Sequence, residues 1–256
     1  MILSWYRRNV NDFGVIRASG LLARVVWRRA LVIARNRIGP ARVHCPCCGW
    51  AGNRFLDYME MGYAVRNIEC PQCGSHSRHR GFYLWLRDEY RLSSKSGTAL
   101  VFAPERALAS LWASAPDVRV LGIDIEPTRD VDVLADVMRL PLSSGVADMI
   151  WCHHVLEQVP DDHQAMTELR RVLKEPAGVM LLSAGMSGDR VTREFGVSEK
   201  SLSGNRRSYG ADLADRLTSA GFEVRQVRYG LNEDEMVKYA IRDEPFYFCK
   251  KVNQST

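Results

Sequence analysis

The stretch TALVFAPERALASLWASAPDVRVLGID (residues 98–124) contains two apolar runs on either side of a segment with helical character. Residues 98–103 predict a buried strand, residues 105–114 a helix, and residues 118–123 a second strand that ends at Asp124. A strand, a helix and a strand in this order are typical of α/β proteins with a parallel sheet.

The same alternation continues to the end of the chain. Further strands are expected at residues 131–134, 147–152, 179–183, 222–229 and 245–250. Helices are expected from Asp161, with Gln164 as its capping-box partner, and over residues 211–220. The pattern predicts a mostly parallel sheet with helices on both faces, which binds ligands at the carboxyl ends of its strands. Residues 187–210 form the only long polar loop expected in this part of the chain.

Composition indicates one catalytic-sized domain with a smaller addition. The chain has 256 residues, of which 46% are hydrophobic, and a formal charge of +5. Its first 44 residues hold nine arginines against Asp12 alone, so they carry +8 and the remaining 212 residues carry −3. Seven cysteines, five of them in two short clusters, favour a reducing compartment and a metal over disulfides. We therefore expect a cytoplasmic protein.

Residues 13–38 predict a basic amphipathic helix. Arg24, Arg28 and Arg29 interrupt its apolar residues, which argues against both a signal peptide and a membrane span. On a helical wheel, arginines 17, 24, 28 and 35 share one narrow sector, and the opposite side holds Val15, Leu22, Val25, Val26, Val32 and Ile33. Such a helix can lie on an anionic membrane at the inner face, contact nucleic-acid phosphates, or pack its apolar side on the protein.

The motif CPCCG (residues 45–49) is repeated as CPQCG (residues 70–74). The overlay pairs Cys45 and Cys48 with Cys70 and Cys73, and leaves Cys47 at the variable position. Two CxxC motifs at this separation are typical of a structural tetrahedral zinc site, which needs no open position for chemistry. A thioredoxin-like dithiol or a lone catalytic Cys47 is the alternative, but neither explains the duplicate.

The cysteine motifs divide the chain into three predicted parts. These are a basic helical segment (residues 1–43), a zinc-ribbon module (44–92) and the α/β domain (93–256). Behind the second motif, residues 75–80 (SHSRHR) either form a solvated helix start or face a substrate, and residues 81–91 read as an apolar helix.

Two acids follow predicted strands of the α/β domain. Asp124 ends the second strand, where a carboxylate can accept hydrogen bonds from both ribose hydroxyls of a nucleoside. Asp136 follows the third strand, where it could accept from an adenine amino group. Each could instead be a solvated loop acid.

Residues 98–183 resemble the class I S-adenosylmethionine-dependent methyltransferases of the type 11 group. The resemblance rests on VLGIDIEP (120–127), LADVMRLPL (134–142), HVLEQV (154–159) and RRVLK (170–174), in this order and spacing. The two cysteine motifs, SRHR and the RxYG stretch around Tyr209 are similar to a bacterial subgroup with an N-terminal zinc ribbon. The family implies a Rossmann-like seven-stranded sheet whose last strand is antiparallel, with S-adenosylmethionine as methyl donor.

The resemblance also implies roles for particular residues. The loop Ala103-Pro104-Glu105 would lie under the methionine part of the cofactor. Asp124 and Ile125 would contact the ribose side, and Asp136 with the Val137 amide the adenine. His153, His154 and Glu157 would line the reaction site, with His154 as the expected general base and His153 as its rival.

The chain departs from the family pattern at two places that bear on activity. The usual glycine-rich first loop is replaced by APERALA, which keeps the backbone further from a cofactor. Where the subgroup has an Asp-His pair ahead of RxYG, this chain has Gly204-Asn205. Three hypotheses follow: a methyltransferase for a small-molecule, saccharide or lipid-linked acceptor, an RNA methyltransferase, and an inactive binding module with this fold.

Overall fold

The computed structural model describes residues 2–61, 63–127, 130–199, 204–242 and 244–252. It divides into two compact units. The N-terminal unit comprises Met1–Tyr90, Ala107–Leu111 and Tyr229–Asp243, and the sheet unit comprises Arg91–Arg106, Trp112–Arg228 and Glu244–Thr256. We describe each unit by itself.

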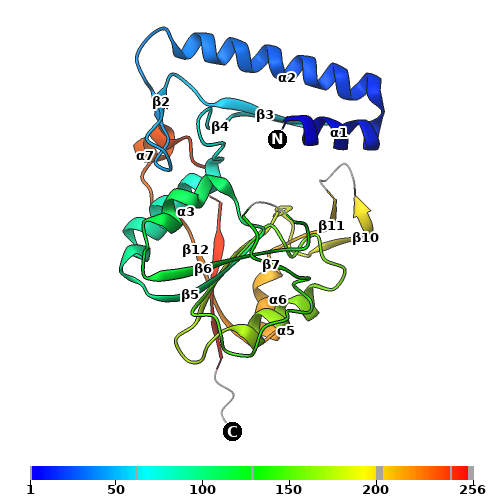
Figure 1. Ribbon diagram of the computed structural model, residues 1–256, viewed down its shortest axis with the longest axis vertical. Helices are drawn as coiled ribbons and strands as arrows, with labels where there is room; N and C mark the ends of the chain where they lie inside the picture. Colours follow the sequence, from blue (N-terminus) through cyan, green and yellow to red (C-terminus); the bar gives the residue numbers. More distant parts are fainter. Residues whose placement is uncertain (1, 62, 128–129, 200–203, 243, 253–256) are drawn as a thin grey trace. The chain divides into compact units, whose positions relative to one another are not determined.

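The N-terminal unit combines long helices with small antiparallel sheets (Figure 1). Helices α1 (Ile2–Phe13) and α2 (Val15–Asn36) are joined at Gly14, whose φ of 84° ends the first helix. Two hairpins follow, β1 (Val43–His44) with β2 (Ala51–Gly52) and β3 (Leu56–Glu60) with β4 (Tyr63–Glu69). Helices α3 (Ser77–Asp88) and α7 (Glu233–Tyr239) complete the unit.

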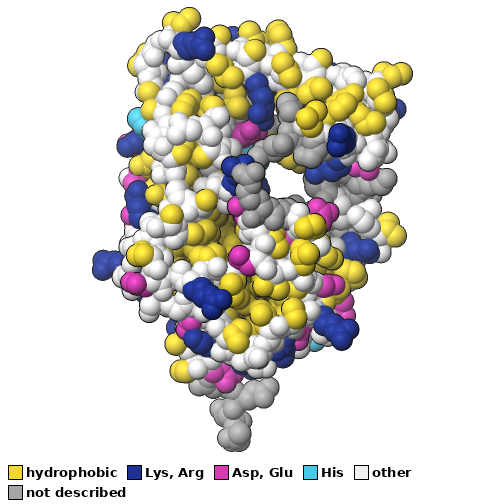
Figure 2. Space-filling model, in the orientation of Figure 1, with side chains coloured by type: hydrophobic (Ala, Val, Ile, Leu, Met, Phe, Trp, Pro, Cys, Tyr) yellow, Lys and Arg dark blue, Asp and Glu magenta, His cyan; other side chains and the backbone are white. Residues whose placement is uncertain are grey.

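Helix α2 packs on the β3–β4 hairpin. A helix at this place is confirmed, but the side that packs on the protein is only partly the predicted apolar side. Leu21 and Val25 are buried in one cluster with Met59 of β3. Val15, Val26 and Ile33, which the helical wheel places on the apolar side, are exposed instead. Hydrophobic side chains gather at the top of Figure 2, over α2. None of the helices in the described residues is long and apolar enough to cross a membrane.

The sheet unit is built on seven strands in the order β12-β13-β9-β8-β5-β6-β7. Their bounds are β5 Gly97–Phe102, β6 Val118–Asp124, β7 Val133–Leu134, β8 Met149–His153, β9 Val179–Ser183, β12 Phe222–Val227 and β13 Phe246–Lys251. Strands β7, β6, β5, β8 and β9 are parallel, and β13 runs antiparallel to both of its neighbours. The α/β class, the seven-stranded sheet and the antiparallel last strand are confirmed.

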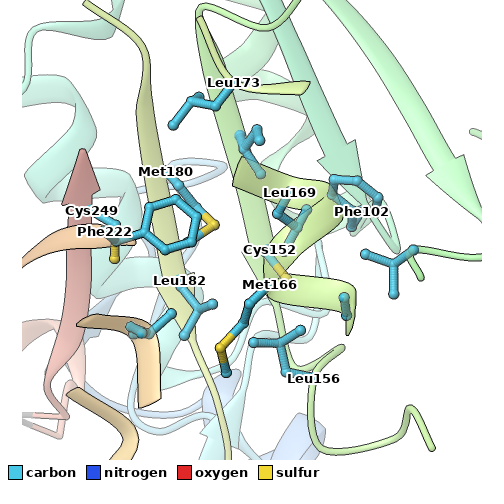
Figure 3. Packing of buried hydrophobic residues seen from close by; sticks show 14 of the residues in the cluster. Phe102, Cys152, Leu156, Met166, Leu169, Leu173, Met180, Leu182, Phe222 and Cys249 are labelled. Carbon is cyan, nitrogen blue, oxygen red and sulfur yellow. The ribbon is translucent and has the colours of Figure 1, made fainter. Parts of the chain in front are cut away.

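Strand β8 lies at the centre of the core, and each of its residues is buried. Ile150 and Cys152 belong to the cluster formed with α5 (Asp162–Val172) and α6 (Leu213–Ser219) (Figure 3). Because side chains alternate along a strand, Trp151 points to the other face, where it meets Trp112 edge-on. A strand that is covered on both faces has a continuous apolar sequence, and ADMIWC (residues 147–152) has this character.

The start of α5 is only partly as predicted. The Asp161 carboxylate accepts a hydrogen bond from the Gln164 backbone N–H at 2.9 Å, so Asp161 is the N-cap. The Gln164 side chain donates to the Met138 carbonyl at 3.3 Å and does not close a capping box. The box instead occurs at α7, where Asn232 and Glu235 cap each other, a helix that periodicity did not indicate.

Two other segments differ from expectation. The long polar loop is occupied by a hairpin, β10 (Arg193–Glu199) with β11 (Asn205–Ser208), and residues 200–203 of that loop lie outside the described residues. The helix expected at 105–114 is a 3₁₀ turn, Arg106–Leu108, followed by the short α4, Ala109–Ala113.

Arg80 in α3 is the most unusual buried residue of the N-terminal unit, with 0% of its surface exposed. Its guanidinium donates to four backbone carbonyls, those of Ile68, Ser75, Tyr239 and Ala240, at 2.6–2.9 Å. The Arg80 side chain therefore ties β4 and the second cysteine motif to the end of α7. The hypothesis that residues 75–80 form a solvated helix start is therefore wrong for Arg80.

Replacing Arg80 by leucine is expected to lower the free energy of unfolding by about 3 kcal/mol or more, because four buried carbonyls lose their donors. Urea unfolding followed by circular dichroism measures the change. Arg66→Leu is the matched control, since the exposed Arg66 makes no side-chain hydrogen bond among the described residues; it should stay within about 0.5 kcal/mol of the parent. Equal effects of the two substitutions would contradict the role of Arg80.

Candidate functional site

The parallel strands of the sheet unit bring several polar side chains to one edge. The register pairs Phe102 of β5 with Ile123 of β6 and with Cys152 of β8, so these strands end side by side. Ser183, the last residue of β9, is level with His153. Residues that immediately follow these strands therefore share the carboxyl edge, which is where such sheets bind ligands.

Asp124 closes β6 at this edge and is half-buried. One carboxylate oxygen, Oδ1, accepts from the Glu126 backbone N–H at 3.1 Å, and Oδ2 has no partner among the described residues. The next side chain, Ile125, is 71% exposed although it is apolar. The carboxylate oxygen can accept a hydrogen bond from a sugar, and the exposed apolar side chain beside it can contact a planar ring linked to that sugar.

The neighbouring loop after β7 holds Asp136 and Val137. Asp136 Oδ1 accepts from the Met138 backbone N–H at 2.8 Å, which leaves its other oxygen available in the described structure. Val137 is buried in the core of the sheet unit and so fixes the course of this loop. Asp124 and Asp136 thus follow adjacent strands, as the sequence pattern predicts.

The first loop leaves β5 through a strained residue. Ala103 has a φ of 48°, in the left-handed region that residues other than glycine adopt at a cost of about 1 kcal/mol or more. Its backbone N–H donates to the Ile123 carbonyl at 2.8 Å, which holds the turn against β6. The glycine-poor loop thus makes the tight turn for which other sequences use glycine. Pro104 and Glu105 follow it, both half-buried.

Glu105 and His153 are brought together at this edge. Glu105 Oε2 lies 2.5 Å from His153 Nδ1. The His153 side chain is only 2% exposed, whereas that of Glu105 is 26% exposed. Burial leaves His153 poorly placed to reach an incoming molecule.

His154 and Glu157 form a second pair, with 2.6 Å between His154 Nδ1 and Glu157 Oε1. The Glu157 side chain is 1% exposed and that of His154 is 35% exposed. Burial alone would raise the pKa of Glu157, but hydrogen bonds from His154 and from the Gly185 backbone N–H, at 2.9 Å, lower it below its ordinary value. Glu157 is therefore an ionised carboxylate at neutral pH.

An ionised carboxylate only accepts hydrogen bonds, so the neutral imidazole of His154 must carry its proton on Nδ1. Nε2 of the partly exposed His154 side chain then carries the lone pair that can accept a proton. His154 also has a left-handed φ of 54°, held by its N–H donating to the Ser183 carbonyl at 3.0 Å. Strain of this kind in a polar residue is frequent at functional sites.

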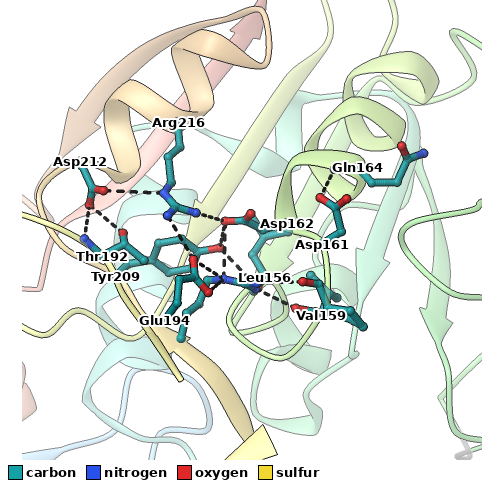
Figure 4. A network of polar contacts seen from close by, with 12 residues as sticks. Leu156, Val159, Asp161, Asp162, Gln164, Thr192, Glu194, Tyr209, Asp212 and Arg216 are labelled. Carbon is teal, nitrogen blue, oxygen red and sulfur yellow. Dashed lines mark hydrogen bonds and ion pairs between the residues drawn. The ribbon is translucent and has the colours of Figure 1, made fainter. Parts of the chain in front are cut away.

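The loop that carries this pair is fixed by the β10–β11 hairpin (Figure 4). Arg207 is buried and donates to the carbonyls of Leu156, Val159 and Pro160 at 2.6–3.1 Å. The Tyr209 hydroxyl donates to the Asp162 carboxylate at 2.8 Å, which raises the pKa of Tyr209 together with burial. Arginine and tyrosine of the RxYG stretch therefore act as structural supports of residues 154–162.

The four predicted metal ligands lie together in the N-terminal unit. All four sulfurs of Cys45, Cys48, Cys70 and Cys73 lie within 4.8 Å of one another. Two of the separations are 3.6 Å, between Cys45 and Cys73, and 3.7 Å, between Cys48 and Cys70. A tetrahedral ion with Zn–S bonds of about 2.3 Å requires sulfurs about 3.8 Å apart. The sulfurs thus fit such an ion.

The two cysteine motifs also have the same backbone structure. Gly49 donates to the Cys45 carbonyl at 2.9 Å and Gly74 to the Cys70 carbonyl at 3.0 Å. Their φ angles of 76° and 73° lie in the left-handed region, which explains the glycine in each motif. Cys47 is buried outside the group of four, with its sulfur 3.9 Å from the His79 carbonyl.

Sequence reasoning missed the positive charge beside these sulfurs. Burial lowers the pKa of Arg80, and the neighbouring thiolates of Cys45, Cys47, Cys70 and Cys73 oppose that shift. No carboxylate forms an ion pair with Arg80 in the described part of the chain. A buried cation without an acidic partner requires another negative group, and four thiolates on a divalent ion would supply two negative charges.

Comparison with known proteins agrees with the geometry of the sheet unit. Residues 104–182 match the family model of the methyltransferase domain. The resemblance to methyltransferases is confirmed for this part of the chain, which runs from the first loop into β9.

Two curated relatives are malonyl-[acyl-carrier protein] O-methyltransferases. The protein of Gallionella capsiferriformans is 34% identical over 96 residues, which are 37% of this chain and 33% of that protein. The protein of a Methylovorus species is 30% identical over 110 residues, 41% of this chain and 35% of that protein. The chain thus spans about a third of the length of these relatives.

Among solved structures, the 1,6-didemethyltoxoflavin-N1-methyltransferase of Burkholderia thailandensis is 15% identical. The match covers 77% of this chain and 98% of that one, with a TM-score of 0.49. A methyltransferase of Listeria monocytogenes is 13% identical, with coverages of 70% and 99% and a TM-score of 0.47.

Replacing Arg207 by alanine is expected to destabilise the sheet unit by about 3 kcal/mol, since three backbone carbonyls, two of them buried, and the Glu194 carboxylate lose a donor. Arg206→Ala is the matched control, because the side chain of Arg206 makes no hydrogen bond among the described residues. Thermal unfolding compares the two variants. A melting temperature of the Arg207 variant equal to that of the control would show that the loop does not depend on Arg207.

Proposed function

We propose that the sheet unit is an S-adenosylmethionine-dependent methyltransferase. The observation that carries the proposal is the carboxyl edge of the sheet, where Asp124, Asp136 and the His154–Glu157 pair follow neighbouring parallel strands. The match of residues 104–182 to the methyltransferase domain supports the same activity.

The bound cofactor would supply an electrophilic methyl group on a sulfonium. Asp124 would accept hydrogen bonds from the ribose hydroxyls, and the exposed Ile125 would be covered by the adenine. Asp136 and the Val137 amide would bind the edge of that ring, and residues 103–105 would lie under the methionine part. This assignment needs no glycine in the first loop, because Ala103 already adopts the left-handed conformation.

His154 would remove the proton from the acceptor. Glu157 fixes the Nδ1–H tautomer of His154, so that Nε2 is the proton acceptor, and stabilises the imidazolium that forms after proton transfer. His153, which is buried against Glu105, would position the first loop and is the weaker candidate for the base. Methyl transfer itself then depends mainly on holding the acceptor in line with the methyl group.

The acceptor would be a small molecule, free or attached to a carrier such as a lipid or an acyl-carrier protein, or a saccharide. The names of the curated relatives support an oxygen acceptor on a carried acyl group. The RNA hypothesis is weakened by Arg28 and Arg29, whose charges are paired with Asp57 and Glu69 and are not available to phosphates.

The N-terminal module around residues 44–92 would be a zinc ribbon held by Cys45, Cys48, Cys70 and Cys73. The sulfur separations and the buried Arg80 support this proposal. The zinc would be structural, because four protein sulfurs complete a tetrahedron and leave no position for water. Cys47, which lies outside the four, would not be a ligand.

Asp124→Ala is expected to weaken binding of S-adenosylmethionine at least about tenfold, as hydrogen bonds to a charged group are lost. Isothermal titration calorimetry measures the affinity. Asp117→Ala is the matched control, because Asp117 precedes the same strand at its opposite end. Absence of binding by the parent protein at millimolar cofactor would leave only the inactive binding module, and equal losses in both variants would refute the role of Asp124.

The tautomer of His154 can be observed directly. Nitrogen-15 NMR of the neutral imidazole should show a protonated Nδ1 and an unprotonated Nε2, the reverse of the form that free histidine prefers. The His154→Gln variant assigns the resonances. A protonated Nε2 in the parent protein would rule out His154 as the base in this arrangement.

Metal analysis of freshly purified protein should give one zinc per chain. Cys70→Ser should lose the metal, because three thiolates bind it far more weakly, and Cys47→Ser should keep it. Less than about half an equivalent in the parent, or equal losses in the two variants, would contradict the assignment.

A further inference from the structure

The two sides of α2 differ in how their charges are used. On the side that faces β3 and β4, Arg28 lies 3.1 Å from the Asp57 carboxylate and Arg29 lies 2.6 Å from that of Glu69. From α1, Arg8 pairs with Glu60 at 3.0 Å. The arginines of the inward side therefore have partners within the unit.

The outward side of α2 is apolar. At 100° per residue, the half of the helix opposite the buried Leu21 and Val25 carries Ile16, Trp27 and Leu31, with glycine and alanines between them. Ile16 is 89% exposed and Trp27 62% exposed. Half of the sixteen exposed large hydrophobic side chains among the described residues fall within residues 3–38. Single exposed apolar residues are ordinary, but a contiguous helix face of them indicates a binding surface.

One border of this face is a row of arginines. Arg17, Arg24 and Arg35 share a narrow sector of the wheel beside the apolar half and are exposed. No described residue pairs with any of their guanidinium groups, and α2 contains no acid. The face thus presents three uncompensated positive charges along a helix of 22 residues, about 33 Å long.

The apolar face and the row of unpaired arginines together fit one kind of partner. RNA would use the arginines and could stack a base on the tryptophan, but would leave the exposed isoleucine and leucine uncovered. A second copy of α2 would cover the apolar face but bring no carboxylate for the arginines. A bilayer with anionic headgroups satisfies both, since apolar side chains enter the boundary of the acyl chains while arginines meet phosphates at the surface. Tryptophan is enriched at that depth.

We propose that the outward face of α2 is a membrane-docking surface that binds anionic phospholipid bilayers in the plane of the interface. The proposal goes beyond methyl transfer and does not depend on it. It places the whole chain, with its sheet unit, at the surface of an anionic membrane.

Co-sedimentation of the full chain with vesicles tests the proposal. We expect binding to vesicles of phosphatidylcholine with about 30% phosphatidylglycerol, and binding at least about tenfold weaker to phosphatidylcholine alone. Raising the salt from 0.1 to 0.5 M should weaken the anionic interaction. The triple variant R17Q/R24Q/R35Q should lose about a hundredfold in affinity for the anionic vesicles.

A matched pair of double variants separates the apolar face from a general effect of charge. I16E/W27E should lose at least about tenfold in affinity, whereas V191E/V237E, which changes two equally exposed valines elsewhere, should lose less than about threefold. Circular dichroism verifies that both are folded. Absence of vesicle binding, equal binding to both lipid compositions, or equal losses in the two double variants would overturn the proposal. So would a dimer of the parent protein in sedimentation velocity without vesicles that I16E/W27E dissociates, because the face would then belong to a second copy.

Discussion

The parallel pairing of β5 with both β6 and β8 is the constraint on which the sheet unit depends. It places the ends of three adjacent strands at one edge, so that residues 21 and 50 positions apart in the sequence become neighbours. Asp148, at the start of β8, accepts from the Thr98 backbone N–H at 2.7 Å and pairs with Lys174, which lowers the pKa of Asp148. The opposite edge of the sheet is thus fixed by structural polar contacts, while at the carboxyl edge Asp124 and Asp136 each keep one carboxylate oxygen without a partner among the described residues. The division of roles between the two edges follows from the fold.

The His154–Glu157 pair lies at this edge and would carry the proton transfer of the proposed reaction. Glu157 is a buried carboxylate whose charge is stabilised by one imidazole and one backbone N–H, and its Oε2 has no hydrogen-bond partner among the described residues. The carboxylate can therefore accept the hydrogen on Nδ1 of the neighbouring histidine. The Arg207 and Tyr209 side chains hold the intervening loop from the hairpin, so residues with no direct chemical role determine where the imidazole points. Departures from the family pattern at Gly204-Asn205 leave this support intact.

Sequence periodicity predicted the sheet because most residues of β5, β8 and β9 are buried, and strands covered on both faces are apolar throughout. It also predicted that Asp124 and Asp136 lie at the ends of adjacent strands, whereas the place of His154 was implied only by the resemblance to methyltransferases. The orientation of α2 was not predictable in this way, because apolar residues occur around most of the helix and only the acids of β3 and β4 select the inward side. Burial of Arg80 was equally hidden, since its partners are backbone carbonyls, which any sequence provides. Strand β10 is mostly exposed and β11 is entirely polar, so neither shows the apolar alternation that reveals strands.

The most direct test of the account is a crystal structure of the protein with S-adenosylhomocysteine. The account predicts the ribose hydroxyls on the Asp124 carboxylate, the adenine over Ile125, and the sulfur on the side of His154. Density for the ligand at any other place, or ribose hydroxyls without contact to Asp124, would contradict it.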